Sequence, residues 1–495
     1  MRVTLAAVLL SVLVGESQAG WKVGEPVLTT SGLAVGRASS KRSGVSEYLG
    51  IPFALPPTGE QRWAPPKQLN SSDGKVINAT KYGPSCAESA SLPYRLNPSS
   101  PPPANIGAAE NEQDEDCLYL NIWTKPQTGE KKKAVMIWIY GGAFLVGSAA
   151  NAVYNGASLA DDEDVVLVSL NYRLGVLGFP GVNIPEKNLG LLDQRAGVEW
   201  IRDNIGQFGG DPNRMILFGQ SAGGASVDFF SYAWTEDPII SGFIPQSGSA
   251  SIIRTDITTN NSLSLWSDLS KTLGCGAVTS EATIANALPC MRAAPAEAVL
   301  NATAPNSSGS TIGTWGPMID GKTVFADLEA RSADGRFVKA PMLVGNTNNE
   351  GATSGTVVGS LQARLSNCAS AEAAQIRRDA DVPAWRYVYS GEFPNQIIGQ
   401  NITGAWHGAE IALIFGNTGV RGPDTEIEKK LIKKIQSAWS GFAKDPKHGL
   451  SQLGWPLYNA QGETVVVIGG KDSDEITFES PSVTDGNACN TPPSV

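Results

Sequence analysis

The sequence predicts an α/β fold, in which a mostly parallel central sheet carries helices on both faces. Two observations lead to this prediction. Several apolar segments are continuous rather than alternating, as expected of parallel strands that are covered on both sides. Helical patterns lie between them, and strands that alternate with helices are typical of α/β sheets. The expected strands are residues 134–140, 165–170, 215–218 and 342–344, and the clearest helices are 191–205 and 427–443.

The composition is that of a folded chain and excludes several other classes. Of the 495 residues, 41% are hydrophobic and 17% are charged, whereas disordered chains combine low hydrophobicity with high charge. The net charge of −10 argues against a nucleic-acid partner, because nucleic-acid surfaces are built from clustered lysine and arginine. We therefore expect a chain with a large buried core.

The N-terminus has the features of a secretory leader. Arg2 supplies a positive start, residues 5–14 form an apolar stretch, and small residues at 17–19 suit cleavage. The apolar stretch is too short to span a membrane, although an N-terminal anchor is the alternative interpretation. Excluding residues 1–19 leaves 20–495, which we expect to form one secreted α/β domain.

Cysteines and sequons agree with export. All six cysteines lie after residue 19, and an even number in a secreted chain favours disulfides, with fifteen possible pairings. Six Asn-x-Ser/Thr sequons predict a glycoprotein, although so short a motif also occurs by chance. The sequons begin at Asn70, Asn78, Asn260, Asn301, Asn306 and Asn401.

The candidate nucleophile is Ser221. It stands in Gly219-Gln220-Ser221-Ala222-Gly223, which matches the G-x-S-x-G pattern. The pattern alone is weak in a glycine-rich chain, but here it follows an expected strand and opens a helix. Its glycines permit a tight turn that exposes the serine hydroxyl above the sheet. The alternative is a glycine-rich turn with a structural serine.

A second glycine turn lies where the strand at 134–140 ends. The segment Gly141-Gly142-Ala143-Phe144 offers small residues, which let backbone N–H groups approach a substrate oxygen and form an oxyanion hole. An ordinary Gly-Gly turn is the alternative.

The candidate base is His407. A hydroxyl nucleophile needs a proton acceptor, most often histidine, and the chain has only two. His407 stands between small residues in a loop-like stretch, whereas His448 stands beside charges and a proline, as on a solvated surface.

The candidate acid is Glu350. The order Ser, acid, His, which is typical of α/β-hydrolases, requires the acid to lie between residues 221 and 407. Glu350 follows the strand at 342–344 and would orient the imidazole and stabilise its cation. Its competitors, none of which directly follows an apolar strand, are Glu329, Asp334 and Glu372.

Further motifs occur in order along the chain, namely Tyr48–Ala54, Glu115–Asn121, Asn171–Gly175 and Asn188–Val227. With these motifs the chain resembles the type-B carboxylesterase family, which includes cholinesterases and secreted fungal lipases. The resemblance covers residues from 25 to 460. It implies the α/β-hydrolase fold, hydrolysis of carboxylic esters, and no metal or cofactor.

The resemblance also implies roles for individual residues. It implies Ser221, Glu350 and His407 as a catalytic triad. It implies an oxyanion hole made by the N–H groups of Gly142, Ala143 and Ala222. Finally, it implies the disulfides Cys86–Cys117, Cys275–Cys290 and Cys368–Cys489, and the ion pairs Arg62–Glu115 and Arg173–Asp193.

Two departures from that family concern substrate charge. Gln220 stands where the family often has glutamate, which removes a negative charge beside Ser221. The segment between Cys86 and Cys117 contains Tyr94 but no tryptophan as a platform for a quaternary ammonium. Both departures predict a preference for neutral over cationic esters.

Two other departures concern the shape of the site. Ala143 replaces the usual glycine, and its methyl group is expected to narrow the acyl pocket. Glu350 and His407 are 57 positions apart, which is a shorter segment than the family usually has and predicts a more open site.

We therefore predict a secreted serine esterase that hydrolyses small-molecule or lipid esters through an acyl-enzyme. A triacylglycerol lipase is the nearest alternative, but its lid would lie in residues 87–116, where the apolar face is thin. That face offers Leu92, Tyr94, Leu96 and Ile106. A non-catalytic binding or adhesion protein on the same fold is the alternative from another class, although such relatives usually lack the nucleophile. Nothing in the sequence indicates a particular oligomeric state.

Overall fold

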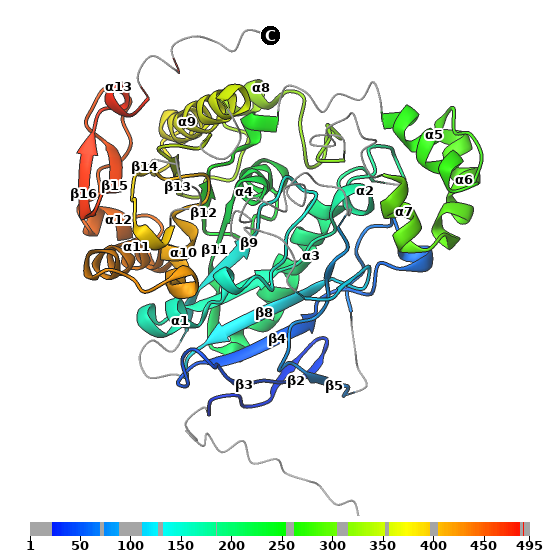
Figure 1. The fold of residues 1–495 in the computed structure, drawn as a ribbon, viewed down its shortest axis with the longest axis horizontal. Helices are drawn as coiled ribbons and strands as arrows, with labels where there is room; N and C mark the ends of the chain where they lie inside the picture. Colours follow the sequence, from blue (N-terminus) through cyan, green and yellow to red (C-terminus); the bar gives the residue numbers. More distant parts are fainter. Residues whose placement is uncertain are drawn as a thin grey trace, which may run out of the picture.

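Strands alternate with helices along most of the chain (Figure 1). The computed structural model describes residues 22–69, 74–88, 111–126, 132–184, 186–253, 262–303, 315–351, 356–396, 404–485 and 489. The leader expected at residues 1–19 lies outside these ranges.

An eleven-stranded sheet forms the centre, in the order β16-β15-β14-β13-β12-β11-β9-β10-β8-β4-β3. Neighbouring strands from β15 to β10 in this order run parallel. Strand β16 at one edge, and β8, β4 and β3 toward the other, are antiparallel. The predicted mostly parallel sheet is thus confirmed. Its strands are β3 (Arg37–Ala38), β4 (Ser46–Pro52), β8 (Tyr119–Thr124), β9 (Lys133–Ile139), β10 (Val166–Leu170), β11 (Gly210–Gln220), β12 (Gly242–Gln246), β13 (Met342–Thr347), β14 (Ala384–Tyr389), β15 (Val465–Gly470) and β16 (Ser473–Glu479).

The four strands expected from the sequence correspond to β9, β10, β11 and β13, and the two expected helices correspond to α3 and α11. Strand β11 begins earlier than expected, at Gly210. Its register shifts between Gly210 and Met215, and residues 211–214 contain two charged side chains, an asparagine and a proline, so they do not extend the apolar run. The helices are α1 (Ala157–Glu163), α2 (Gly175–Gly178), α3 (Leu189–Asn204), α4 (Ala222–Ala233), α5 (Ser262–Thr272), α6 (Glu281–Ala293), α7 (Ala296–Ala302), α8 (Leu328–Ala333), α9 (Thr356–Asp379), α10 (Ile411–Phe415), α11 (Glu426–Lys444), α12 (Gly449–Gln452) and α13 (Pro481–Thr484).

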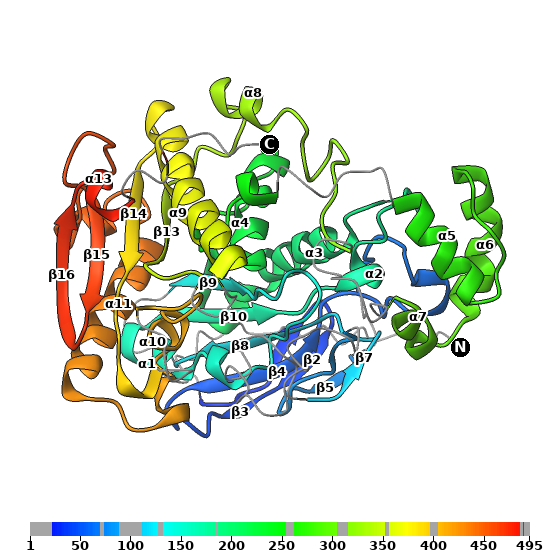
Figure 2. The same cartoon turned by 45° about the horizontal axis from the view of Figure 1, so that its top comes forward.

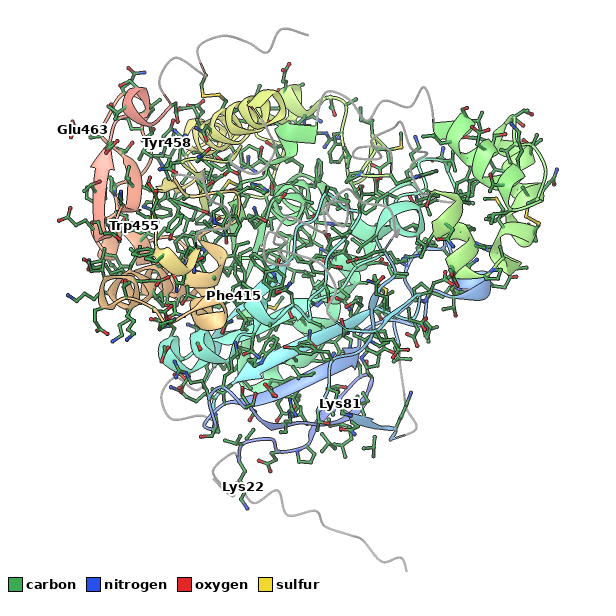
Figure 3. All side chains as sticks on the ribbon, in the orientation of Figure 1. Lys22, Lys81, Phe415, Trp455, Tyr458 and Glu463 are labelled. Atoms are coloured by element: carbon green, nitrogen blue, oxygen red, sulfur yellow. A yellow bond between two sulfur atoms is a disulfide. The ribbon has the colours of Figure 1, made fainter. Side chains whose placement is uncertain are left out.

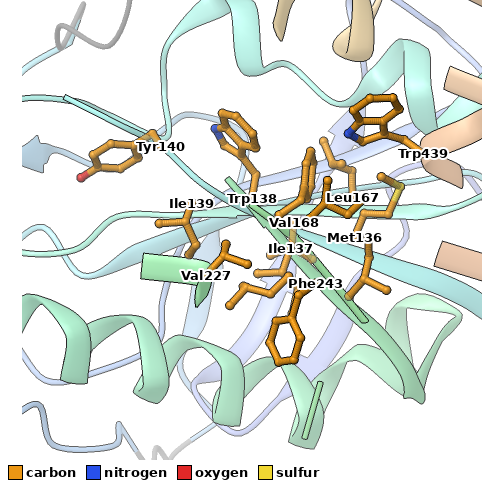
Figure 4. Packing of buried hydrophobic residues seen from close by; sticks show 14 of the residues in the cluster. Met136, Ile137, Trp138, Ile139, Tyr140, Leu167, Val168, Val227, Phe243 and Trp439 are labelled. Carbon is orange, nitrogen blue, oxygen red and sulfur yellow. The ribbon is translucent and has the colours of Figure 1, made fainter. Parts of the chain in front are cut away.

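Helices cover both faces of the sheet. At Gly242 of β12 the space for a side chain is filled by Phe442 of α11. The next residue, Phe243, faces the opposite side, where its ring contacts Phe230 of α4, because successive residues of a strand point to opposite faces. Figure 4 shows the same division, with Trp138 and Trp439 on one side of the strands and Val227 and Phe243 on the other. The prediction of helices on both faces is confirmed.

Smaller elements surround the sheet. Strands β1 (Val27–Thr29), β2 (Gly32–Val35) and β5 (Val76–Asn78) form a separate three-stranded sheet, and β6 (Ser85–Cys86) pairs with β7 (Gln113–Asp114). Helices α5, α6 and α7 stand together at the end of the molecule opposite β15 and β16 (Figure 2). No helix within the described ranges has both the length and the apolar character needed to cross a bilayer.

Aromatic side chains fix the segment that follows His407. Phe415, at the end of α10, is fully buried and lies inside the molecule in Figure 3, whereas Lys22 and Lys81 lie at its lower edge. Its ring packs against Trp138 of β9 and Phe218 of β11, at centroid distances of 5.1 and 5.8 Å. This packing ties α10 to the two strands that precede the glycine turn and Ser221.

Candidate active site

Ser221 occupies a sharp turn between β11 and α4. Its backbone has φ 58° and ψ −122°, a conformation that L-residues rarely adopt and that persists only when the surroundings enforce it. Here the enforcement is close packing, because a Cβ on Gly223 would lie 2.1 Å from the carbonyl oxygen of Ile139. Helix α4 can therefore begin directly against the end of β9, and the strained serine is held at the tip of the turn.

The segment after β9 lies beside this turn. A Cβ on Gly141 would lie 2.5 Å from the carbonyl oxygen of Gln220, so only glycine permits the two turns to approach so closely. Gly142, Ala143 and Phe144 follow with φ of 115°, 57° and 62°. Among the described residues, the N–H groups of Gly142 and Ala143 donate no hydrogen bond. Ala222 is the first residue of α4, where a helix leaves its N–H groups free.

Glu350 and His407 come together because two loops pair. Asn349 donates its backbone N–H to the carbonyl of Ala405 at 3.0 Å, and Ala405 donates to Oδ1 of Asn348 at 2.8 Å. This pairing brings Glu350, just beyond β13, into a short hydrogen bond between its Oε2 and Nδ1 of His407. Oε1 of Glu350 accepts from the backbone N–H of Thr347 at 2.8 Å.

The carboxylate is buried and the imidazole is reachable. The Glu350 side chain is 0% exposed and the His407 side chain 20%. Burial opposes ionisation of Glu350, yet its pKa is lowered, because the imidazole charge and hydrogen bond outweigh burial. The pKa of His407 is raised: burial lowers it, but the charge and hydrogen bond of Glu350, aided by Glu410, prevail. The pair is therefore built to stabilise an imidazolium.

The Nε2 atom of His407 contacts Gln220. The distance between this atom and Nε2 of the Gln220 side chain is 3.0 Å. Within the described part of the chain, the hydroxyl of Ser221 makes no hydrogen bond to the imidazole. The three residues predicted as a triad thus share one end of the sheet, and the described contacts join two of them.

A second buried carboxyl, which the sequence reasoning missed, lies beside this pair. Glu410 is 1% exposed, and its Oε1 accepts from Nε2 of Gln246 at 3.3 Å. Burial and the nearby charge of Glu350 raise the pKa of Glu410 to about 7. The only sequence signal was its place three positions after His407 at the start of a short helix.

The other site predictions are placed as follows. Glu329 and Asp334 lie in or just after α8 and Glu372 lies in α9, and none of the three contacts His407. His448 is exposed, and its side chain bonds only to Asp445 among the described residues.

The structure contains all the covalent and ionic pairs that the resemblance implies. The disulfides Cys86–Cys117, Cys275–Cys290 and Cys368–Cys489 are formed. Arg62 meets Glu115 at 2.6 Å, and Arg173 meets Asp193 at 2.7 Å. The apolar residues considered for a lid (Leu92, Tyr94, Leu96 and Ile106) and the sequons at Asn70, Asn260, Asn306 and Asn401 lie outside the described residues. Across the described ranges, no cluster of His, Cys, Asp and Glu could hold a metal ion.

Comparison with known proteins gives a consistent result. The model of the carboxylesterase family matches residues 25–360. A protein named secreted lipase 5 from Gibberella zeae is 31% identical over 92% of this chain and 92% of its own length. Chlorogenic acid esterase from Aspergillus niger is 32% identical over 90% of this chain and 91% of its own, and para-nitrobenzyl esterase from Bacillus subtilis is 28% identical over 88% and 93%. The chain therefore belongs to the carboxylesterase family, and it is a carboxylic ester hydrolase with the α/β-hydrolase fold.

Proposed function

We propose that this ester hydrolase is a secreted serine esterase that acts on neutral esters, with Ser221 as nucleophile, His407 as base and Glu350 as the orienting acid. The observation that carries the proposal is the hydrogen bond between the buried Glu350 and His407, beside the strained turn of Ser221. A carboxylate on Nδ1 keeps the proton there and leaves Nε2 free to accept one. This Nε2 contacts Gln220, and Ser221 is the next residue in the chain.

The proposed reaction proceeds through an acyl-enzyme. The Ser221 oxygen attacks the ester carbonyl while its proton passes to Nε2 of His407. The N–H groups of Gly142, Ala143 and Ala222 bind the oxyanion, each worth about 3–4 kcal/mol. The tetrahedral intermediate expels the alkoxide, which takes the proton from His407. Water then attacks the acyl group, with His407 as base, and restores the serine.

Labelling and mutation test the proposed roles. We expect a fluorophosphonate probe to label the wild type but not Ser221→Ala, and this result also separates an enzyme from a non-catalytic protein on the same fold. Glu350→Gln is expected to lower kcat about 10⁴-fold, because the imidazole then adopts the wrong tautomer. Glu410→Gln, a matched change of a neighbouring buried carboxyl, is expected to have a far smaller effect. Equal losses in the two variants would contradict the role of Glu350.

The preference for neutral esters rests on Gln220, an uncharged side chain that contacts the imidazole. We expect kcat/KM for an uncharged butyrate ester to exceed that for butyrylcholine, since the side chain before Ser221 carries no negative charge to attract the cation. A clear preference for the choline ester would overturn this part of the proposal.

Lipase activity is a second candidate, because a relative of 31% identity over 92% of the chain is named a secreted lipase. Rates across p-nitrophenyl esters from acetate to palmitate, together with emulsified long-chain triglyceride, separate the two. An esterase is fastest on short, dissolved esters. A sharp rise in rate once triglyceride forms an emulsion would identify a lipase.

Secretion is proposed from the leader-like residues 1–19 together with three disulfides, which persist in oxidising compartments. The same proposal takes residues 20–495 as the mature domain. N-terminal sequencing of protein recovered from the culture medium is expected to begin at Gly20. Protein retained in the cell with an intact Met1 would contradict it.

A further inference from the structure

We propose that Gln220 is a positioning residue, whose side-chain amide donates to Nε2 of His407 and holds the imidazole in its neutral, proton-accepting form until Ser221 takes its place. This inference rests on the proposed function, because it concerns the base of that reaction. It differs from the substrate preference argued above, which depends only on the missing charge of Gln220.

The hydrogen bonds of the imidazole determine where its protons lie. Nδ1 of His407 is hydrogen-bonded to a carboxylate oxygen of Glu350, and a carboxylate can only accept. Nδ1 therefore carries a hydrogen, and in the neutral ring Nε2 carries the lone pair. The side-chain nitrogen of Gln220 can only donate. A nitrogen–nitrogen contact of 3.0 Å is therefore a hydrogen bond for neutral His407, whereas an imidazolium would bring two donors together.

The amide of Gln220 is confined in this position. Gln220 is the last residue of β11, paired in register with Gln246 of β12, and is 3% exposed. A Cβ on Gly141 would lie 3.2 Å from its Oε1, and a Cβ on Gly408 would lie 3.4 Å from its Nε2. The two glycines thus leave a slot between the segment after β9 and the loop of His407, and the amide fills this slot.

The amide of Gln220 and the hydroxyl of Ser221 compete for the same lone pair, on Nε2 of His407. Ser221 can transfer its proton only when its hydroxyl, rather than the amide of Gln220, faces Nε2. Donation to the lone pair disfavours protonation of the ring. The titratable groups that act on the imidazole are Glu350, beyond β13, and Glu410, before α10, and both favour its cation. Gln220 is the group that opposes them.

Substitutions at Gln220 test the proposal through the pH profile of kcat/KM. The acidic limb of this profile reports the pKa of the base in the free enzyme. Gln220→Met keeps the length of the side chain and removes the donor, so the limb is expected to move to higher pH by a few tenths of a unit. Gln220→Glu replaces the donor with an acceptor for the protonated ring, so the limb is expected to move up by about one unit. A downward shift in Gln220→Met would mean that the amide accepts from the cation, and this result overturns the proposal, as does an unchanged limb in both variants.

A measurement on the wild type keeps the test independent of how the variants fold. The chain has only two histidines, so ¹⁵N-histidine labelling gives two rings, and the ring of His448 is identified by its loss in His448→Gln. We expect Nε2 of His407 to have the chemical shift of an unprotonated nitrogen at a pH above the acidic limb, and a proton on Nε2 there would overturn the proposal. Fluorophosphonate labelling of the wild type but not of Ser221→Ala, combined with unchanged pH profiles, would reject this inference and leave the proposed function intact. Absence of labelling in the wild type would reject the proposed function itself.

Discussion

At the scale of single residues, unusual backbone conformations and shifted pKa values occur together around Ser221. Ala143, Phe144 and Ser221 all have φ near 60°. A residue other than glycine in this backbone conformation costs about 1–2 kcal/mol of conformational free energy. Glu410 adds a buried carboxyl whose pKa is raised to about 7 by burial and by the charge of Glu350. Such features are retained only where the surrounding structure enforces them.

We predict that Ala143→Gly broadens acyl specificity. Removing the methyl group relieves the strain at φ 57° and widens the space beside the N–H groups that would bind the oxyanion. The ratio of kcat/KM for p-nitrophenyl hexanoate to that for the acetate is expected to rise several-fold. The free energy of unfolding is expected to rise by up to about 1 kcal/mol. An unchanged ratio would show that Ala143 does not border the acyl group.

We also predict that Glu410→Gln changes how stability depends on pH. The pKa of Glu410 is raised from 4.5 to about 7 in the folded chain, so between these values the folded chain keeps a proton that the unfolded chain releases. The wild type therefore loses stability as the pH rises through this window. Glutamine mimics the protonated carboxyl, so the variant is expected to match the wild type below pH 4.5 and to exceed it above pH 7. The expected difference is on the order of 3 kcal/mol.

Thermal unfolding of both proteins across this pH range checks the prediction. Parallel stability curves for the two proteins would contradict it.

At the scale of elements, the sequence predicted the strands that end at the site better than the contacts between them. Strands β9, β11 and β13 were predicted because parallel strands buried on both faces appear as uninterrupted apolar runs. The antiparallel strands β3, β4 and β8 were not predicted, because β4 and β8 mix polar and apolar residues and β3 is only two residues long.

Some features of the candidate site could be predicted from the sequence and others could not. Ser221 and the glycine turn at 141–144 could be predicted, because local backbone geometry demands a particular sequence. The contact of Gln220 with His407 and the burial of Glu410 could not, because both depend on a loop pairing between residues 348–349 and 405. Residues so far apart in the chain leave no periodic signal of their contact.

The two sequons within the described residues differ in the element that carries them. Asn78 is exposed on β5, an edge strand, and its Oδ1 accepts from the hydroxyl of Thr80 at 2.7 Å. Asn301 lies in α7, and the hydroxyl of Thr303 donates instead to the carbonyl of Leu300. Both asparagines are exposed, but Asn301 is held in a helix, and the hydroxyl of its sequon threonine is already hydrogen-bonded to the backbone. We therefore predict high occupancy at Asn78 and low occupancy at Asn301, measured by mass spectrometry of tryptic peptides before and after enzymatic deglycosylation. The reverse order would contradict the prediction.

At the scale of the whole molecule, one disulfide joins segments that lie far apart in the chain. Cys368 in α9 and Cys489 near the C-terminus enclose 121 positions, and this span includes His407, whereas Cys275 and Cys290 enclose only 15. The ion pair between Arg386 of β14 and Asp485 at 2.7 Å fastens the same C-terminal region. The longer loop restricts the unfolded chain more strongly.

We predict that the double variant Cys368→Ser, Cys489→Ser loses about 5 kcal/mol of unfolding free energy, and that Cys275→Ser, Cys290→Ser loses about 3 kcal/mol. Urea denaturation of the two variants and the wild type measures both losses. A larger loss in the variant of the shorter loop would show that local packing, rather than chain entropy, sets the stabilisation.

The edge strand β16 has a consequence for behaviour in concentrated solution. An outer strand exposes unpaired backbone groups that can recruit a strand from another copy. Asp474 on this strand is paired with Lys434 at 2.8 Å, but Glu475 and Glu479 also lie along the edge, so two edges brought together repel each other through these like charges. The protein is thereby protected from forming continuous intermolecular sheets, and this protection is lost in acid, where the carboxylates become neutral.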